Sequence, residues 1–288
     1  MKKPRVLVTG ATGHLGGALL RGLGGRHDLT PLGFSRGEGP DLRDREAVQA
    51  FAARGSFDTI VHLAGTKDLA ACEASPRHAW ELNVLPLVHL AEAFPRAWII
   101  LISTDYVFSG DRGGYTERDA PAPGTAYGRA KAAAEFAGAL FAPCFTVIRL
   151  SALYDRAAAF PKFLEAELSA GRPVDAYIDV FYTPTWHEDF CAILDRLLGM
   201  EVSAQGVFHV CGPRISRYAF AHFYAQARGF DPALVRAAKR GPENRLLPDL
   251  SLDCQETCAR FGLSITPHAD AIARLSRTMA QGATPAFR

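Results

Sequence analysis

The chain starts with the stretch that predicts its fold, RVLVTGATGHLGGALL, which runs from Arg5 to Leu20. A short apolar strand at Val6–Val8 leads into glycines, and the residues after Gly13 have the apolar spacing and small side chains of a helix packed closely on a sheet. Glycine contributes no side chain and loses the most conformational entropy on folding, so this strand end needs bare backbone. Either a ligand approaches the backbone there, or helix and sheet pack tightly.

More β-rich runs follow, and helical stretches separate them. They lie at residues 29–34, within FDTIVHLAG (57–65), within AWIILIST (97–104) and, after the Ala-rich segment Ala130–Leu140, within CFTVIRL (144–150). Such alternation predicts an α/β fold, a Rossmann-type doubly wound parallel sheet with helices on both faces. Beyond Arg149 the alternation weakens and Pro and Gly become frequent. We expect an NAD(P)-binding Rossmann domain over 1–150. Residues 151–288 should form mainly a smaller, less regular substrate-binding lobe, with some segments returning to the Rossmann core.

Composition excludes several classes of protein. The 288 residues carry 32 Lys and Arg against 30 Asp and Glu, a balance that gives no bulk attraction for nucleic acid. No uninterrupted apolar run approaches the ~20 residues of a membrane span, and glycines interrupt the apolar segment that a signal peptide would need after Lys3. Six scattered cysteines without a CxxC pair predict reduced thiols in a cytoplasmic protein, and Cys254 and Cys258 have no histidine cluster nearby to suggest a metal site.

The glycine spacing itself indicates a phosphate-binding turn. Gly10-x-x-Gly13-x-x-Gly16 joins a strand to a helix, which places backbone N–H groups and a helix N-terminus where a pyrophosphate can sit. The residues predicted to contact the cofactor in this turn are Gly10, Thr12, Gly13, His14, Leu15 and Gly16. His14 is expected either to touch phosphate or to lie on the surface.

The loop after the second strand bears on the choice of cofactor. Ser35 and Arg36 stand where a ribose-binding acid would sit in an NAD-specific site. A guanidinium can form paired bonds to a 2′-phosphate and stack on adenine, so Arg36 favours NADPH over NADH, although a solvated loop arginine is an equal alternative. Asp41 and Leu42 follow closely and are expected to border the adenine.

Three residues in the middle of the chain suggest acid–base chemistry. Thr104 ends a buried strand, and Tyr127 and Lys131 are one helical turn apart in TAYGRAKAAAE. A tyrosine with an ordinary pKa of about 10 is a poor acid–base group at neutral pH unless a nearby cation stabilises its phenolate. Lys131 and the positive nicotinamide ring of an oxidised cofactor are such cations, and Thr104 can hydrogen-bond the same substrate oxygen.

Together these motifs resemble the extended short-chain dehydrogenase/reductase family over nearly the whole chain. The resemblance is carried by TGATGHLG, Asp41-Leu42, VHLAG, Asn83, STDYVF, YGRAK and VIRLSALY. Within that family, STDYVFSG and YTPTWHEDF are most similar to dTDP-4-dehydrorhamnose reductases. The resemblance implies a catalytic triad of Thr104, Tyr127 and Lys131, with Tyr127 as proton donor and Lys131 also on the nicotinamide ribose. It further implies that Leu63, Ala64 and Gly65 line the NADP site and that Asn83 is structural or orders solvent.

The implied activity is NADPH-dependent transfer of hydride to a keto group of a nucleotide-linked sugar, with residues beyond Arg149 covering the sugar nucleotide. One position departs from the family, since Ala152 stands where those reductases usually carry Trp, which leaves the sugar open. A dehydratase is disfavoured because Asp105-Tyr106, rather than Asp-Glu, follows Thr104. A nucleotide-sugar epimerase and a non-catalytic NADP-binding regulatory protein, similar to the methionine adenosyltransferase β subunit, remain alternatives. A homodimer is one assembly that the sequence allows.

Other conspicuous residues have structural interpretations. Thr185 and Glu188 fit a helix N-terminal capping box, which would leave His187 and Asp189 solvated in the first turn. The aromatic residues of RYAFAHFYAQA (217–227) have helical spacing and predict core packing.

Overall fold

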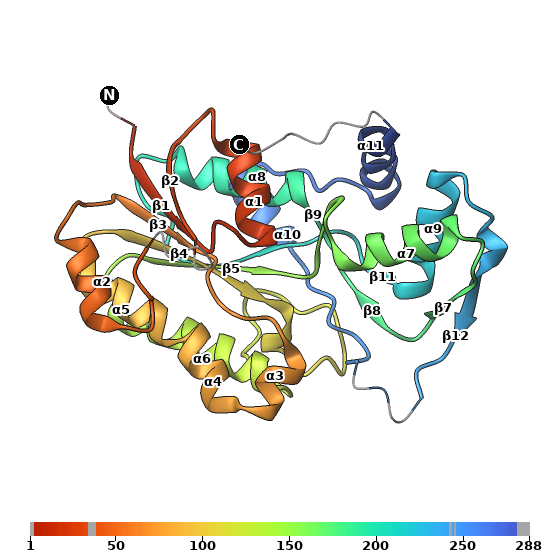
Figure 1. The fold of residues 1–288 in the computed structure, drawn as a ribbon, viewed down its shortest axis with the longest axis horizontal. Coiled ribbons are helices and arrows are strands. Elements are labelled where there is room, and N and C mark those ends of the chain that lie inside the picture. The colour runs from red at the N-terminus through yellow and green to blue at the C-terminus, as the bar shows by residue number, and fades with distance from the viewer. Residues whose placement is uncertain (1–2, 34–38, 242–243, 245, 281–288) are drawn as a thin grey trace.

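The structure, a computed structural model, describes residues 3–33, 39–241, 244 and 246–280. Its centre is a parallel sheet of six strands in the order β10-β5-β4-β3-β1-β2 (Figure 1). The strands are β1 (Arg5–Thr9), β2 (Asp28–Leu32), β3 (Thr59–His62), β4 (Trp98–Thr104), β5 (Phe145–Leu150) and β10 (Gly206–Val210). The predicted Rossmann-type α/β fold is therefore confirmed. The second strand begins one residue before the predicted 29–34 and ends at Leu32, and residue 34 lies outside the described part of the chain.

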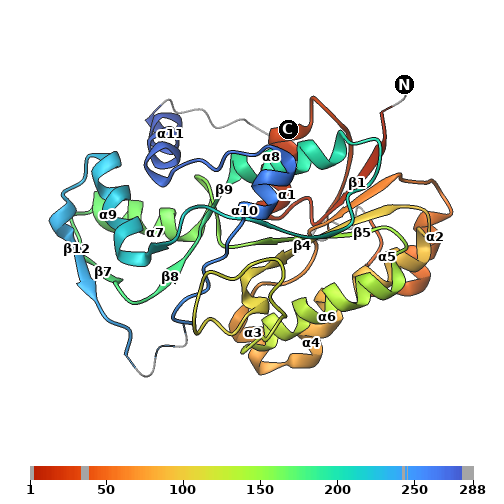
Figure 2. The same ribbon diagram turned by 180° about the vertical axis from the view of Figure 1, so that it is seen from behind.

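Helices cover both faces of this sheet (Figures 1 and 2). On one face lie α1 (His14–Leu23) and α8 (His187–Leu198), and on the other lie α2 (Arg45–Ala52), α5 (Leu85–Ala93) and α6 (Ala126–Phe141). Two apolar clusters fill the two interfaces, because the central strands bury side chains on both faces; every residue of β4 is buried. A strand buried on both sides reads as a continuous apolar run, which is why WIILIS was recognisable.

The strand order reverses at β1. The chain runs outward from β1 to β2 and then crosses to the other side of β1, where β3 pairs with it. All six strands are parallel, so their carboxyl ends share one edge, and open sheets of this kind bind ligands at that edge beside the reversal. The glycine turn after β1 and the segments after β3 and β4 all lie there.

Much of the chain after β5 forms a lobe beside the sheet, at the right of Figure 1. It contains α7 (Ala159–Ser169), α9 (Arg217–Arg228) and α11 (His268–Ala280), and three two-stranded sheets. These sheets pair β7 (Val174–Tyr177) with β12 (Val235–Ala238), β8 (Phe181–Tyr182) with β11 (Ile215–Ser216), and β6 (Leu153–Tyr154) with β9 (Thr185–Trp186). The lobe has its own apolar cluster, in which Phe220 and Tyr224 of α9 are buried and Tyr218 packs against them, so the predicted core role is confirmed for these residues. It is wrong for Phe223, which is exposed.

Shorter elements complete the fold: α3 (Leu69–Ala74), α4 (Pro76–Asn83), α10 (Gln255–Phe261) and the 3-10 turns η1 (Asp105–Val107) and η2 (Pro232–Leu234). Both α8 and β10 lie after residue 150 in sequence yet pack with the central sheet. The domain division at 150/151 stays a prediction.

The six cysteines are free thiols, and the sulfurs of Cys254 and Cys258 are 3.9 Å apart. Across the described residues no group of three or more His, Cys, Asp or Glu side chains is arranged to hold a metal ion. The described helices include none that is both long and apolar enough to cross a membrane.

Candidate active site

The glycines after β1 form a turn that leads directly into α1. Gly10 has φ +68°, and a Cβ on it would lie 2.7 Å from the Ala64 backbone nitrogen. Gly16 is equally constrained, because its Cβ would lie 2.4 Å from the Gly10 carbonyl oxygen. Gly13 differs: its φ is −76°, and apart from a 3.2 Å approach to that oxygen its Cβ would meet nothing within 4 Å. Two glycines therefore serve packing, and the third leaves open space at the N-terminus of α1.

That open space fits the pyrophosphate of a dinucleotide, since unpaired N–H groups at a helix N-terminus attract anions. His14 and Leu15, the first residues of α1, line a cavity between the sheet and the lobe. Thr12 faces the end of β2, where a Cβ on Gly33 would lie 2.5 Å from the threonine methyl carbon. The turn thus brings its predicted residues to the carboxyl edge of the sheet.

The end of β3 is tied to the end of β1 by a threonine. Thr9 Oγ1 hydrogen-bonds His62 Nδ1 at 2.8 Å and accepts the backbone N–H groups of Leu63 and Ala64, each at 3.3 Å. Burial lowers the pKa of His62 to about 3, so this ring is neutral. The loop 63–65 is therefore held beside the glycine turn, as a shared cofactor site requires.

Asn83 supports the loop 63–65 by packing against Gly65. Gly65 has φ +153°, and a Cβ on it would lie 2.5 Å from Asn83 Oδ1. The Asn83 side chain is buried and donates through Nδ2 to the Ala79 carbonyl oxygen at 2.9 Å. Its amide therefore packs against the loop that it supports.

The second cofactor loop is described only in part. Ser35 and Arg36 lie outside the described residues. Asp41 is paired with Arg43, whose side-chain hydrogen bond holds the pKa of that carboxyl below its usual value. The Leu42 side chain is buried in the apolar cluster under the sheet, so only its backbone remains to border an adenine.

The start of α6 is fixed closely against the end of β4. Thr125 caps the helix by accepting the Gly128 N–H at 3.0 Å. A Cβ on Gly128 would lie 2.1 Å from the Tyr106 carbonyl oxygen, so only glycine lets α6 approach this closely. The neighbouring Tyr127 ring consequently packs edge-on against the Tyr106 ring, with 5.8 Å between centroids.

Thr104, Tyr127 and Lys131 meet where this helix crosses β4. Burial raises the pKa of Tyr127, and its hydrogen bond with Thr104 lowers it in part. Lys131 Nζ donates to the Ile102 carbonyl oxygen at 2.7 Å, and burial lowers the pKa of this ammonium to about 8. The structure thus places the two hydroxyls together and the lysine beneath them against the strand backbone.

Sequence reasoning missed the role of Asp105 beside this group. Its carboxylate is buried and accepts hydrogen bonds from Thr104 Oγ1 at 3.0 Å and Ser151 Oγ at 2.6 Å. Burial raises the pKa of Asp105 to about 6, although both hydroxyls and the charge of Arg217 oppose the rise. The signal was present in STDYVF, where a carboxylate directly follows the strand.

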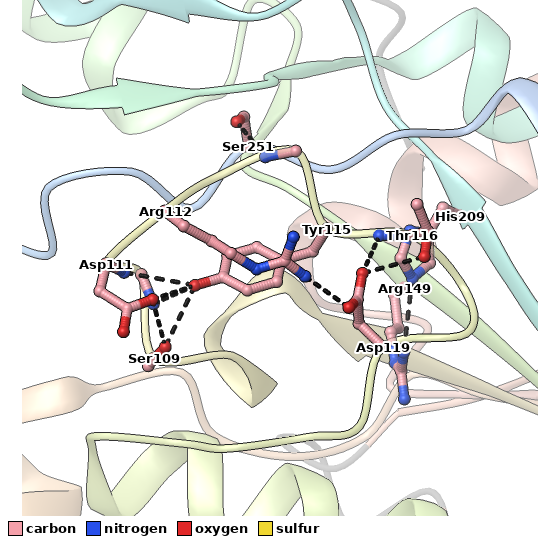
Figure 3. Close-up of polar contacts among 11 residues, drawn as sticks. Ser109, Asp111, Arg112, Tyr115, Thr116, Asp119, Arg149, His209 and Ser251 are labelled. Carbon is pink, nitrogen blue, oxygen red and sulfur yellow. Dashed lines mark hydrogen bonds and ion pairs between the residues drawn. The ribbon is translucent and has the colours of Figure 1, made fainter.

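A second polar group beneath the site was also missed. Arg149 on β5 forms a buried ion pair with Glu135 on α6 at 2.7 Å, and Ser103 Oγ donates to the same carboxylate at 2.5 Å. Arg149 also lies 5.0 Å above the Phe108 ring. Its Nη1 is 3.4 Å from His209 Nε2 (Figure 3). Glu135 is one turn beyond Lys131 on the same helix, and its charge favours the charged lysine.

The loop after β4 is closed by its own contacts (Figure 3). Tyr115 Oη accepts the Gly110 N–H at 3.0 Å and donates to Asp111 at 2.8 Å, while the Arg112 guanidinium covers the same ring. The Gly114 N–H donates to Ser251 Oγ at 2.9 Å. This loop therefore connects the catalytic strand end with the segment that follows β12.

A cavity of about 350 Å³ joins these parts. From the sheet side it is lined by His14, Leu15, Thr104, Asp105, Tyr106 and Tyr127. From the lobe side it is lined by large apolar and aromatic side chains, among them Tyr154, Phe160, Phe181, Tyr182, Phe220 and Leu247, and by the small Ala152. Its volume is within the range of small-molecule sites, roughly 300–1,000 Å³.

Two cationic side chains also reach this cavity, the exposed Lys67 after β3 and Arg217 at the start of α9. The Arg217 guanidinium is 3.9 Å from the Tyr182 ring centroid and 5.2 Å from that of Phe160, and its Nε makes no hydrogen bond with the described residues. An anion in this cavity would find a positive charge on the lobe side.

The glycine turn and the lobe are also joined by an ion pair. His14 Nε2 is 2.5 Å from Asp155 Oδ1, and Arg21 Nη2 is 3.4 Å from Oδ2. Burial alone would raise the pKa of Asp155, but the hydrogen bond and charge of His14 outweigh burial and lower it. His14 is therefore half-buried against the lobe rather than a bare surface residue, and its contact with a phosphate stays a prediction.

The expected capping box at Thr185 is wrong. α8 begins at His187 after Trp186, and Thr185 lies in β9, where its hydroxyl donates to the Val210 carbonyl oxygen at 2.9 Å. The predicted solvation of the first turn is wrong for Asp189, whereas His187 is half-buried and Glu188 is exposed. Asp189 is buried and accepts hydrogen bonds from the Thr266 N–H at 3.1 Å and from Thr266 Oγ1 at 2.7 Å.

Comparison with known proteins identifies the lineage of this arrangement. Residues 4–281 match the family model described as RmlD substrate binding domain. The chain is 32% identical over 254 residues to a probable dTDP-4,6-dihydroxy-2-methyloxan-3-one 4-ketoreductase of Streptomyces antibioticus, covering 84% of each chain. It is also 30% identical over 256 residues to the methionine adenosyltransferase 2 subunit beta of Rattus norvegicus, covering 83% of this chain and 76% of the relative.

Among solved structures, the fold is similar to dTDP-4-dehydrorhamnose reductase from Bacillus anthracis in complex with NADP, with a TM-score of 0.86 at 24% identity. That alignment covers 96% of this chain and 100% of the other. A family match over nearly the whole chain, together with the glycine turn and the Thr104 and Tyr127 site, shows that the chain belongs to the RmlD substrate binding domain family of extended short-chain dehydrogenases/reductases.

Proposed function

We propose that this protein is an NADPH-dependent reductase that delivers hydride to a keto group of a nucleotide-linked sugar. The observation that carries the proposal is the cavity itself. It contains the hydroxyls of Thr104 and Tyr127, opens to the glycine turn through His14 and Leu15, and has the cation Arg217 on its lobe side. A dinucleotide on the sheet and an anionic substrate under the lobe would meet at those two hydroxyls.

The residues of the sheet edge suit a dinucleotide. The open space at Gly13 and the N-terminus of α1 would take the pyrophosphate, and the loop of Leu63, Ala64 and Gly65 would lie along the nicotinamide half. Lys131 Nζ has three hydrogens and gives one to Ile102, so two remain for a ribose. The preference for NADPH over NADH rests on Arg36 and stays a prediction. When bound, the cofactor supplies the hydride.

The protein supplies the proton and the orientation. Tyr127 donates its phenolic proton to the oxygen of the reduced carbonyl, and Thr104 holds the same oxygen by a hydrogen bond. The ammonium of Lys131 below them stabilises the phenolate that remains. Buried aromatic walls keep water from the reacting atoms.

The charge and shape of the lobe side support a nucleotide sugar. Lys67 and Arg217 would neutralise a diphosphate, and the Tyr182 and Phe160 rings beside Arg217 offer faces for a sugar or a base. Ala152 leaves more room than a Trp would at this wall, so we expect the sugar to differ in bulk from that of reductases with the aromatic residue. The relative from Streptomyces antibioticus is itself named as a ketoreductase of a dTDP-linked sugar.

Two further properties belong to this proposal. Exposed Phe136, Leu140 and Phe141 on α6 and Trp80 on α4 support a homodimer, because a second copy would cover this apolar surface. Six free thiols support a location in the reducing cytoplasm.

The similarity to a methionine adenosyltransferase β subunit supports the alternative of a non-catalytic NADP-binding protein. NADPH oxidation, followed by absorbance against a panel of keto-sugar nucleotides that begins with dTDP-4-dehydrorhamnose, separates the possibilities. A reductase oxidises NADPH in proportion to one reduced product. Bound cofactor without turnover of any member would overturn the proposal in favour of the binding protein, and interconversion of sugars on tightly retained NAD without net oxidation would favour an epimerase.

A further inference from the structure

We propose that His14 is a bridging residue, which donates one ring hydrogen to Asp155 of the lobe and the other to a phosphate of the bound dinucleotide, so that the cofactor holds the lobe against the glycine turn. The inference rests on the proposed function in one respect, the dinucleotide at the start of α1. It starts from a contact that the proposed reaction does not use, the pair of His14 Nε2 and Asp155 Oδ1 at 2.5 Å.

The Asp155 carboxylate decides which nitrogen of His14 carries the hydrogen. Although burial alone would raise the pKa of Asp155, the hydrogen bond and charge of His14 lower it, so the carboxyl is ionised at neutral pH and can only accept. His14 Nε2 must therefore be the donor, and in a neutral ring Nδ1 then has a lone pair and no hydrogen. Nδ1 makes no hydrogen bond with the described residues, and the His14 side chain is 19% exposed.

A phosphate oxygen at Nδ1 requires a second ring hydrogen. Phosphate oxygens only accept hydrogen bonds and bear negative charge, so the lone pair of a neutral ring would repel them. His14 is the first residue of α1, directly after the open space at Gly13, and it lines the cavity. An imidazolium donates at both nitrogens and attracts both anions. The bridge between Asp155 and a phosphate therefore forms with the uptake of one proton from solvent.

The other charged and titratable groups around this pair leave the bridge to His14. Arg21 on α1 is exposed, with its Nη2 3.4 Å from Asp155 Oδ2. Burial lowers the pKa of His187, the first residue of α8, so this ring is neutral, and Glu188 beside it is exposed. The helix dipole opposes a positive ring at the start of α1. A bound phosphate offsets this opposition, so His14 gains its second proton when the dinucleotide binds.

Asp155 connects the bridge to the lobe wall of the cavity. Its Oδ1 also accepts the Ala157 N–H at 2.7 Å, and its backbone carbonyl accepts the Ala158 N–H at 3.3 Å. This turn leads into α7, and Ala158 and Phe160 beyond it line the cavity. A stronger pair of His14 and Asp155 therefore stabilises the wall that faces the substrate.

A matched control lies just beyond the other end of α1. His27 Nε2 is 2.7 Å from Asp195 Oδ1, and Arg26 Nη1 is 2.6 Å from Oδ2 of the same carboxylate. This cluster repeats the residue types of the pair at His14, yet the described lining of the cavity includes none of its three residues. Changes to it should leave the response to the dinucleotide unchanged.

The first test counts protons as NADP⁺ binds. Calorimetric titration at a pH of about 7.5, in two buffers that differ in ionisation enthalpy, gives the number of protons taken up. We expect the wild type to take up as much as about one proton more than His14→Gln, in which the phosphates of NADP⁺ titrate as before. Asp195→Asn should match the wild type. Equal uptake by the wild type and His14→Gln would overturn the proposal.

Asp155→Asn tests the same proton from the lobe side and keeps the count decisive if His14→Gln binds no NADP⁺. An amide can donate as well as accept, so it can donate to Nε2 of a neutral His14 and leave the single ring hydrogen at Nδ1 for the phosphate. The variant should therefore bind NADP⁺ without the proton that the wild type takes up. A proton count equal to that of the wild type would contradict the role of Asp155.

Hydrogen exchange shows whether the bridge holds the lobe. NADP⁺ should slow exchange of the Ala157 and Ala158 amides by about tenfold in the wild type, as one hydrogen bond between charged groups allows. In His14→Ala the slowing should be confined to the glycine turn and the sheet edge, whereas His27→Ala should behave as the wild type. Equal slowing at these two alanines in His14→Ala would overturn the bridge.

These measurements use NADP⁺ and no substrate, so they separate the bridge from the reductase. Absence of NADP⁺ binding to the wild type would overturn both. Proton uptake and slowed exchange, without turnover of any keto-sugar nucleotide, would count against the reductase and leave the bridge standing.

Discussion

The two walls of the cavity are built differently. On the sheet side, the site consists of strand ends and turns in which backbone is exposed, as at Gly13, or a short side chain projects from a rigid strand, as at Thr104. On the lobe side, it consists of large side chains such as Tyr182 and Arg217, presented by two-residue strands and a helix start. Backbone recognition suits a ligand that is the same throughout a family, whereas side-chain recognition suits one that varies. Changes to the sheet side should therefore affect the cofactor and the chemistry, and changes to the lobe side should affect the substrate alone.

The largest effect is expected from Tyr127→Phe, which tests the chemistry of the sheet side. The variant keeps the ring and its packing against Tyr106 but loses the proton donor. Hydride transfer should fall by about 10²–10⁴, or roughly 3–5 kcal/mol of barrier. Single-turnover NADPH oxidation measures the loss, and NADPH titration serves as the control because affinity should hardly change. Near wild-type transfer would remove Tyr127 from the catalytic site.

The next effect separates two glycines of the same turn. Gly13→Val fills the open space at the start of α1 and should weaken dinucleotide binding by about a hundredfold while the protein stays folded. Gly16→Val instead drives a Cβ to 2.4 Å from the Gly10 oxygen and should lower the free energy of unfolding with or without cofactor. Calorimetric titration and thermal unfolding measure the two losses. If Gly13→Val binds as the wild type does, the turn serves packing only.

A smaller effect tests the lobe side. Arg217→Gln removes the cation of the cavity and should raise KM for an anionic substrate by about tenfold, since a hydrogen bond to a charged group contributes ~1.5–3 kcal/mol. NADPH affinity should be unchanged. Arg214→Gln is the matched control, because Arg214 also stacks on an aromatic ring, 3.7 Å from the Phe181 centroid, without lining the cavity. Equal rises in KM would show that packing of the lobe, and not charge, controls the substrate.

The smallest effect concerns Asp155, which joins the two walls through its contact with His14. The pKa of Asp155 is lowered in the folded protein, so its contribution to stability is present above the ordinary value of about 3.9 and is lost as the pH falls through the folded value. Asp155→Asn should reduce the free energy of unfolding by about 1–2 kcal/mol at neutral pH. The gap between variant and wild type should close in acid. Denaturant unfolding at both pH values measures it, and a gap that persists unchanged in acid would mean that the charge of Asp155 contributes nothing.

The difference between the walls also explains what the sequence could predict. Buried strands and a glycine turn depend on neighbours in sequence, so β1, β4 and the spacing of Tyr127 and Lys131 were recognisable. The lobe wall gathers residues from positions as distant as Ala152, Tyr182, Arg217 and Leu247, and no local pattern connects them. The prediction that Thr185 caps a helix was wrong for the same reason. A capping box is a local pattern, whereas Thr185 lies in β9 because that strand pairs with the distant β6.

The sequence also did not reveal which polar side chains pair with one another in the buried part of the site. Asp105 and Glu135 stand inside recognised motifs, yet their roles depend on Ser151 and Arg149, which lie on β5 or directly after it. Pairing between β4 and β5 places Thr104 opposite Leu150 and so brings these side chains together. Register of this kind follows from the folded sheet rather than from either segment alone.

The central claim, that this chain reduces a keto-sugar nucleotide with hydride from NADPH, is tested most directly by following the hydrogen itself. NADPH deuterated at the transferable position of its nicotinamide is incubated with the protein and dTDP-4-dehydrorhamnose, or the panel member that is turned over, and the product is analysed by mass spectrometry. We predict one deuterium, bound to carbon in the sugar, for each NADPH oxidised. A product without deuterium, or consumption of the sugar nucleotide without oxidation of NADPH, would contradict the account.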